Sequence, residues 1–430
     1  MHNSGRQVAF LIPLMLAISF GTAPANLVEP HLAVEFFTPH DVYVNTSKCA
    51  TIEGVPANPV CVASQNDYET VQAVVGGVSG VLQLWVAPIL GKLSDAHGRR
   101  PLFIAVAVLP TVTMASLFVV QVAGMSIWVY FAIFFVNQFN PINIVLLSFV
   151  ADVTTTEERP LAYSLILGGF QLSQLLAVAT YTGLSSAVAP AILVLIGVIA
   201  IGACIFYAFF MIPESHPVDK RKPFELDASQ LDPRSSLKIF LQPQLRMLAA
   251  TMFVFFFSFV ALGTTSGGYS VFRFNLQPQQ IGTLTIVLTV AALLVTIAVL
   301  PVALRYFNEF RLLCVSMLVA AGASVFLSLV PTFELYLVGA CVSAATAVAF
   351  PIISVSMSKR ISKLDQGTLD GGQVALTSIS GAVSGVLIGS VIFRISRLLG
   401  FYIAAGGFVL TAFLALRIPA FEAVESEDGG

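Results

Sequence analysis

The chain has 430 residues, of which 57% are hydrophobic and only 10% are charged. A soluble protein carries about 25% charged residues, so most of this surface is expected to face lipid. The net charge of −2 gives no indication of nucleic-acid binding, and the absence of a phosphate-binding loop motif excludes an ATP-driven pump. No set of His, Cys and carboxylate residues has metal-ligand spacing or resembles a catalytic constellation, so neither a cofactor nor enzymatic activity is expected.

Twelve apolar runs are each long enough to cross a bilayer, for which about 20 residues are needed. The first run is too long for the apolar core of a signal peptide and lacks a convincing cleavage site, so we expect it to stay as a membrane anchor. The sequence places the predicted spans at 8–33, 69–91, 101–122, 125–151, 161–183, 188–211, 246–272, 280–304, 310–330, 334–357, 368–393 and 399–418.

The placement of Lys and Arg residues predicts the orientation, because cytoplasmic loops are enriched in positive charge. With both termini in the cytoplasm, 17 of the 21 basic residues lie on the cytoplasmic face. The loop 35–68 is then outside. It contains a glycosylation sequon at Asn45, although one sequon is expected by chance, and a pair of cysteines, Cys49 and Cys61. An oxidising exterior favours a disulfide between these cysteines, with free thiols as the alternative.

A long basic linker separates two sets of six spans. Corresponding features recur at an offset of roughly 210 residues, as in the segment Lys92–Arg100 and its counterpart Arg305–Arg311. We therefore expect an all-α membrane protein of 12 transmembrane helices in two pseudo-symmetric six-helix bundles. The predicted domains are an N-terminal bundle, a cytoplasmic linker, a C-terminal bundle and an acidic tail, at 1–212, 213–245, 246–420 and 421–430.

The segment between the second and third spans, Gly91-Lys-Leu-Ser-Asp95-Ala-His-Gly98-Arg99-Arg100, resembles the signature of the major facilitator superfamily. That signature reads G-x-x-x-D-R-x-G-R-R/K, and the departure here is Ala96. The segments 148–163, 212–215 and 358–367 resemble the tetracycline-exporter-like branch, and the last also resembles the proton-coupled folate transporter branch. The resemblance covers nearly the whole chain except the loop 35–68 and implies the major facilitator fold.

Two departures weaken the prediction of a proton-driven drug antiporter. Many such proteins have a Gly-Pro pair in the fifth span, whereas here Gly168-Gly169 is followed by Phe170-Gln171. Many proton-coupled members have a buried Arg in the fourth span, and residues 125–151 contain none.

The resemblance implies a gating role for residues at the cytoplasmic face, which in this family clamp the two bundles in the outward-open state. These residues are Asp95, Gly98, Arg99, Arg100 and Asp152. The alternative is a set of ordinary interfacial charges without partners.

Two charges near the outer ends of the repeat-equivalent spans 1 and 7 are also functional candidates, because charges at membrane depth are rare. We expect an attraction between Glu29 and Arg273, either as part of an outer gate or as a proton-sensitive switch. The alternative is that each side chain extends to the membrane surface independently.

Uncharged polar residues share helix faces in several spans. An amide in lipid lacks hydrogen-bond partners, so these faces must meet other helices or water. We expect them to line a substrate cavity, and the alternative is that they only bond helices to one another. The predicted cavity residues are Asn26, Gln83, Asn137, Gln138, Asn140, Asn143, Gln171, Gln174, Tyr269, Gln373 and Thr377.

Together these features predict a secondary active transporter of a small organic solute, coupled to protons and working by alternating access. A facilitative uniporter and a non-transporting membrane sensor or scaffold on the same fold are the alternatives. An exporter of amphipathic compounds and an importer of organic anions or other metabolites both stay open, and the charge-poor cavity favours a neutral or weakly charged substrate. The expected partners are the substrate, protons and the lipid bilayer. We expect a monomer in the plasma membrane or in an endolysosomal or vacuolar membrane.

Overall fold

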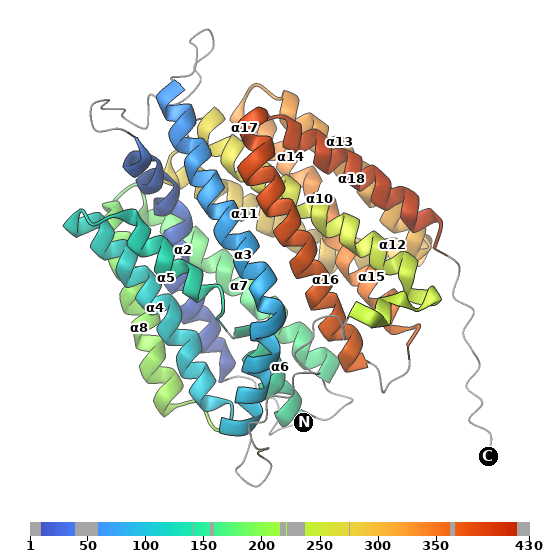
Figure 1. Ribbon diagram of the computed structural model, residues 1–430, viewed down its shortest axis with the longest axis horizontal. Coiled ribbons are helices and arrows are strands. Elements are labelled where there is room, and N and C mark those ends of the chain that lie inside the picture. Colours follow the sequence, from blue (N-terminus) through green and yellow to red (C-terminus); the bar gives the residue numbers. More distant parts are fainter. Residues whose placement is uncertain are drawn as a thin grey trace.

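The computed structural model is a bundle of long helices (Figure 1), and it describes residues 10–38, 59–140, 142–154, 159–215, 221, 237–274, 276–361 and 366–418. The first half of the chain forms α2 (Leu11–Phe37), α3 (Pro59–His97), α4 (Arg100–Ala123), α5 (Ile127–Asn137), α6 (Ile142–Val153), α7 (Arg159–Leu184) and α8 (Pro190–Phe210). The second half begins with the short turn η3 (Ile239–Leu241) and continues with α10 (Pro243–Arg273), α11 (Pro278–Leu294), η4 (Val295–Val299), α12 (Leu300–Tyr306), α13 (Glu309–Leu329), α14 (Phe333–Ser343), η5 (Ala344–Val348), α15 (Ala349–Ser358), α16 (Gln366–Val386), η7 (Leu387–Ile392), α17 (Phe393–Ile395) and α18 (Leu399–Leu416).

Each of the twelve predicted spans is occupied by helix, and the predicted all-α membrane fold is confirmed. By length and composition, nine helices within the described ranges can cross a membrane, and α3 is a tenth if its two parts, bent by 49°, count as one span. The remaining two spans are α7 and the interrupted pair α5–α6. The predicted glycosylation site Asn45, the cysteine Cys49 and the acidic tail lie outside the described residues, as does the side chain of Cys61.

Helix boundaries follow local sequence signals. Proline stands in the first turn of α4, α8, α10 and α11, where its missing N–H leaves no unpaired donor. At the other end of α4, Gly124 takes a left-handed conformation with φ of 64°, which glycine adopts without steric cost. Two interruptions are found at repeat-equivalent places, between α5 and α6 in span 4 and at the turn η5 in span 10.

Packing also repeats between the halves. In the first half α8 packs against α2 and α4, and in the second half the equivalent helix α18 packs against α10 and α13. Glycines allow these helices to approach closely. Gly197 of α8 lies against the backbone of α2, and Gly407 of α18 lies against Ser258 of α10. The two halves therefore use the same internal arrangement, with the N-terminal half on the left and the C-terminal half on the right in Figure 1.

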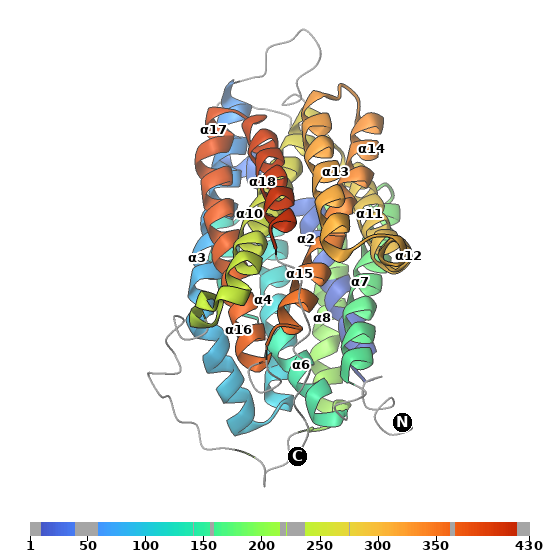
Figure 2. The ribbon, with the colours of Figure 1, turned by 90° about the vertical axis from the view of Figure 1, so that its right-hand side faces the viewer.

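The two halves meet mainly along α3 and α16 and along α7 and α11. The first of these pairs runs side by side in both views (Figures 1 and 2). Gly77 of α3 packs on Val386 of α16, and Gly389 of η7 packs on Ala73 of α3. A β-carbon added at Gly389 would lie only 2.6 Å from the β-carbon of Ala73. Contacts between the halves thus concentrate toward the end of the bundle where α3 begins and α17 ends. We call this the Arg394 end, and the opposite end, where α3 finishes, the Arg99 end.

Replacing Gly197 by Val should destabilise the N-terminal bundle. A β-carbon at this position would lie 2.8 Å from the carbonyl oxygen of Gly21, and backbone cannot move aside as a side chain can. Overpacking of this kind costs about 1–3 kcal/mol. The matched control is Gly202→Val in the same helix, where the nearest atom lies at 4.0 Å. The thermal unfolding temperature of the detergent-solubilised protein should fall for Gly197→Val alone, and an equal fall for both variants would contradict this packing.

Candidate functional site

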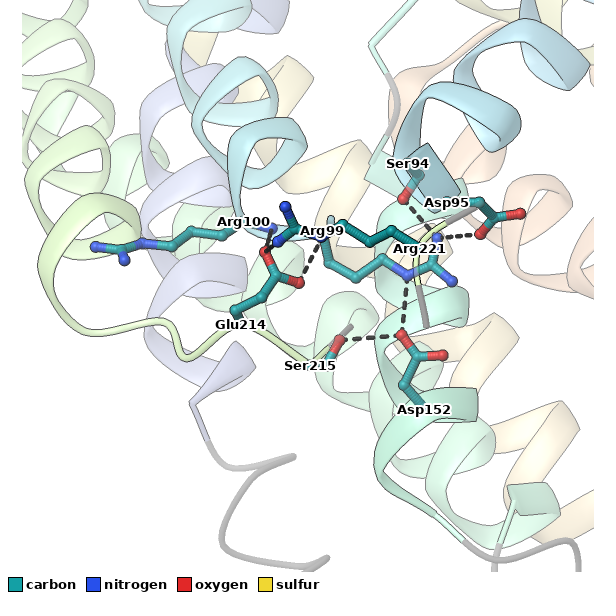
Figure 3. Close-up of polar contacts among 8 residues, drawn as sticks. All are labelled: Ser94, Asp95, Arg99, Arg100, Asp152, Glu214, Ser215 and Arg221. Atoms are coloured by element: carbon teal, nitrogen blue, oxygen red, sulfur yellow. Dashed lines mark hydrogen bonds and ion pairs between the residues drawn. The ribbon is translucent and has the colours of Figure 1, made fainter. Parts of the chain in front are cut away.

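Arg99 is the centre of a polar network at the Arg99 end (Figure 3). Its side chain is buried, with 6% of the residue exposed. The guanidinium donates from Nε to Oδ2 of Asp152 at 2.9 Å, and from Nη1 to Oδ1 of Asp95 and Oγ of Ser94, both at 2.7 Å. Burial acts against the charge of Arg99, but the hydrogen bonds to Asp152 and Asp95 outweigh it and raise the pKa of the guanidinium above its ordinary value. The cation is therefore fixed between the two helices that carry these acids.

Glu214 binds the first turn of α4 from a position more than a hundred residues later in the chain. Its two carboxylate oxygens accept from the backbone N–H groups of Arg99, at 2.8 Å, and Arg100, at 3.2 Å. These are unpaired donors at a positive helix terminus, where a carboxylate is stabilised. Arg221 approaches the same carboxylate at 3.7 Å, and Ser215 donates to Asp152 at 3.1 Å. The segment after α8 thereby joins α4 and α6 into one unit.

Gly98 is required by this arrangement for two reasons. Its φ of 93° lies in the left-handed region, where a side chain is strained. In addition, a β-carbon at this position would overlap the carboxylate of Glu214. The neighbouring Arg100 donates to the carbonyl of Phe209 and stacks over its ring at 5.3 Å, which ties the start of α4 to the end of α8.

The structure thus brings together the five residues predicted at this face. Sequence reasoning missed Ser94, Glu214, Ser215 and Arg221 as members of the same network. The start of α4 indicates that a hydrogen-bond acceptor is needed, because the first N–H groups of a helix have no partner within the helix. The sequence did not indicate which acid supplies this acceptor.

A first cavity of about 350 Å³ lies inside the N-terminal half. Asn26, Glu29, Gln72 and Asn137 are among its polar lining residues. The carboxylate of Glu29 accepts a hydrogen bond of 2.6 Å from the hydroxyl of Tyr130 and another from the amide of Gln72. Within the described part of the chain it contacts these donors rather than Arg273, so the Glu29–Arg273 attraction stays a prediction.

A second cavity of about 490 Å³ lies between the two halves. It shares Asn26, Pro30, Tyr68 and Gln72 with the first cavity, so the two are contiguous. Its far wall comes from α10 and α16 and is rich in glycine. Glu69 of α3 also lines this cavity and is 7% exposed. This residue was missed by sequence analysis because the polar stretch Gln65–Asp67 precedes it and makes it read as the end of a loop.

The structure separates the other predicted cavity residues into different environments. Asn26 and Asn137 line cavities, and Gln83 donates to the backbone carbonyl of Gln138 at the break between α5 and α6, at 2.6 Å. Asn140 bonds α4 through the carbonyl of Val106, at 3.1 Å, and accepts from the backbone of Ile142. It therefore joins helices, which is the alternative that the sequence left open.

In the C-terminal half, Gln373 accepts from Ser354 at 2.8 Å and Thr377 bonds its own helix at Val374. Tyr269 is buried against Phe401, with 5.3 Å between ring centroids.

In the N-terminal half, Gln171 is exposed and Gln174 is half-buried on α7, and neither lines the two cavities described above. The side chain of Asn143 lies outside the described part of the chain.

Polar contacts close the Arg394 end between the halves. Arg394 donates to Asp67 at 2.8 Å and to Thr70 at 3.1 Å, and Arg397 donates to Gln65 at 2.5 Å. The Arg394–Asp67 pair is about half exposed, so it contributes at most about 1 kcal/mol. The close packing of α3 on α16 is therefore the stronger element at this end.

Comparison with known proteins agrees with this architecture. The family model of the Major Facilitator Superfamily matches residues 10–371. The chain belongs to the Major Facilitator Superfamily. It is thus an integral, multi-pass membrane protein, and the predicted family membership is confirmed.

Proteins similar to this chain include bovine Hippocampus abundant transcript-like protein 1, which is 25% identical over 333 residues, covering 73% of this chain and 62% of the bovine protein. The chain thus spans about three fifths of the length of that relative. Tetracycline resistance protein, class C, of Escherichia coli is 25% identical over 320 residues, covering 74% of this chain and 78% of that protein. The crystal structure of the human organic anion transporter MFSD10 (TETRAN) has a TM-score of 0.67 at 20% identity, covering 96% of this chain and 99% of the other.

Replacing Glu214 by Ala should loosen the first turn of α4 in this superfamily member. The N–H groups of Arg99 and Arg100 lose their acceptor, and loss of a helix cap costs about 0.5–2 kcal/mol. Amide hydrogen exchange in the peptide spanning residues 98–103 should become faster. The matched control is Glu334→Ala, because Glu334 is an exposed glutamate in the first turn of α14. This substitution should leave hydrogen exchange in the 98–103 peptide unchanged. Unchanged exchange in Glu214→Ala would show that the carboxylate does not hold this helix terminus.

Proposed function

We propose that this chain is a secondary active transporter that moves a small organic solute by alternating access and is driven by a proton gradient. The observation that carries the proposal is the position of the second cavity, which lies between two halves packed against each other at the Arg394 end. A solute held there is in contact with both halves. Tilting of one half against the other would then expose the cavity at opposite ends in turn.

The closed Arg394 end fits an inward-facing state under the predicted orientation. At the Arg99 end, the hydrogen bonds of Arg99 described above remain within the N-terminal half and its following segment. We propose that this network keeps the first bundle rigid and presents the exposed acid Asp95, whose side chain is 48% exposed, to the opposite half when that end closes. The signature residues would then set the balance between two states rather than bind solute.

Glu29 is our candidate for the proton-binding group. It is buried at membrane depth, where an ionisable residue is a functional candidate by default, and it lines the first cavity. Its bonds with Tyr130 and Gln72 link α2 to α5 and α3, so a change in its protonation would alter contacts among three helices. This coupling supports proton-driven transport over simple facilitated diffusion.

Transport can be tested with purified protein in sealed lipid vesicles under an imposed pH gradient. A panel of organic amines, neutral compounds and carboxylates is scanned for accumulation, and proton movement is followed with a pH-sensitive dye. We expect at least one compound to accumulate together with proton flux. Glu29→Gln should abolish gradient-driven accumulation while leaving solute exchange, because the substituted amide cannot carry the proton.

Glu334→Gln is the control for this experiment and should behave as the unmodified chain. Accumulation without proton movement would replace the proposal by a uniporter or another coupling ion. If no compound moves and Asp95→Asn changes nothing, the scaffold function would be favoured instead.

Replacing Gly77 by Val should open the Arg394 end. A side chain at this position overlaps Val386 of α16, so the two halves cannot keep their present approach. A cysteine placed at the cavity residue Thr264, in a chain whose own cysteines are replaced by alanine, should react several-fold faster with an impermeant maleimide from the predicted outer side. Gly322→Val in α13 is the control, because a β-carbon there meets no atom within 4 Å and the residue does not line the cavity. Equal reactivity in the two variants would argue against α3–α16 packing as the closure.

A further inference from the structure

Glu69 is a buried carboxylate aimed at the second half of the protein. One of its oxygens packs directly against Gly268 of α10, and a β-carbon at that glycine would overlap it. With 7% of the residue exposed, Glu69 lines the cavity between the halves. No hydrogen bond or ion pair joins the carboxylate of Glu69 to another residue in the described ranges, in contrast to the carboxylate of Glu29, which has two donors.

Two charged groups act on Glu69 from neighbouring elements. Burial and the neighbouring Glu29 of α2 disfavour a negative charge on its carboxylate, whereas Arg397, between α17 and α18, favours it. The guanidinium of Arg397 is engaged with Gln65 at 2.5 Å and lies over the ring of Phe393 at 5.7 Å, and it is not in ion-pair contact with Glu69. The carboxylate therefore keeps acceptor positions that a ligand can use.

The cavity around Glu69 is lined largely by glycine and apolar residues. Gly76, Gly263 and Gly267 line the cavity, and a β-carbon at any of them would meet no atom within 4 Å. Val260, Val271 and Ile281 supply the apolar side chains. Among the described residues that line the cavity there is neither Lys nor Arg, so the cavity offers a buried carboxylate beside a space lined by glycine and apolar side chains.

We propose that this cavity binds compounds that carry a protonated amine on a flat apolar body, with Glu69 as the counter-charge. An ammonium group donates up to three hydrogen bonds, and a charge-assisted bond to a buried carboxylate is among the strong polar contacts in proteins. The body lies along the glycine wall. This inference names the substrate class of the proposed transporter and rests on that function. An organic anion, the class of compound for which the human transporter MFSD10 is named, would face Glu69 and Glu29 in this chain without a cation among the described lining residues.

Three compounds with one aromatic body test the charge preference. Naphthylmethylamine, naphthylmethanol and naphthoate are titrated into the full-length protein in detergent, and binding is measured calorimetrically up to millimolar concentration. We expect the amine to bind at least about tenfold more tightly than the alcohol, and the carboxylate to bind most weakly. Equal affinities, tighter binding of the carboxylate, or no detectable binding of the amine would overturn the proposal.

Substitutions locate the binding. Glu69→Gln should reduce the affinity for the amine by about tenfold or more and leave that for the alcohol unchanged. Glu69→Asp keeps the charge and should retain a preference for the amine, which separates loss of charge from loss of folding. The side chain introduced by Gly263→Val projects into the open space of the cavity. It should therefore weaken the binding of both the amine and the alcohol. An unchanged amine affinity in Glu69→Gln would place the counter-charge elsewhere and refute the assignment.

Failure of this inference can be distinguished from failure of the proposed function. If neutral or carboxylate compounds move across the vesicle membrane and Glu69→Gln has no effect, the proposed transport function is supported and the amine site is refuted. Amine binding that depends on Glu69, without movement of any compound across the vesicle membrane, would support the site and refute transport.

Discussion

The close approach of α3 to α16 is the constraint on which the cavity depends. Gly77 of α3 and Gly389 of η7, the segment that continues α16, bring the two helices together because neither carries a side chain into the contact. Lipid gives no hydrophobic reason for helices to associate, so small residues and dispersion contacts must supply the attraction. The half-exposed Arg394–Asp67 pair adds little energy but fixes which residues face each other. A close contact at one end is suited to the joint that the proposed alternating access requires.

The opposite end is built differently, since its energy lies in charges held inside one half. Arg99 is buried with both acids in place, and removing both acids would leave an uncompensated buried charge. Glu214 adds a backbone cap that depends on the segment after α8. In the proposed mechanism this network would make α3, α4, α6 and the end of α8 move as one body. Alternating access needs such rigid bodies, because a flexible bundle would absorb the tilt without moving the cavity.

The two buried glutamates have different environments, and this difference separates their proposed roles. Glu29 is held by donors from α5 and α3 within one half, which suits a group whose protonation is transmitted to neighbouring helices. Glu69 faces the other half across the cavity and keeps acceptor positions that a ligand can reach. A cation bound at Glu69 would lie at the interface that must separate. Solute and proton would then act on different contacts of the same α2–α3 region.

The sequence by itself determined the twelve spans, the signature residues and the doubling of the chain, because hydropathy, proline and glycine act over one or two helical turns. Only the tertiary structure decided that Glu214 caps α4, that Asn140 joins helices while Asn26 lines a cavity, and that Glu69 faces this cavity without a bonded partner among the described residues. These outcomes depend on which helix from elsewhere in the chain lies opposite each side chain. A polar residue in a span has the same local pattern whether it faces water, a neighbouring backbone or a ligand.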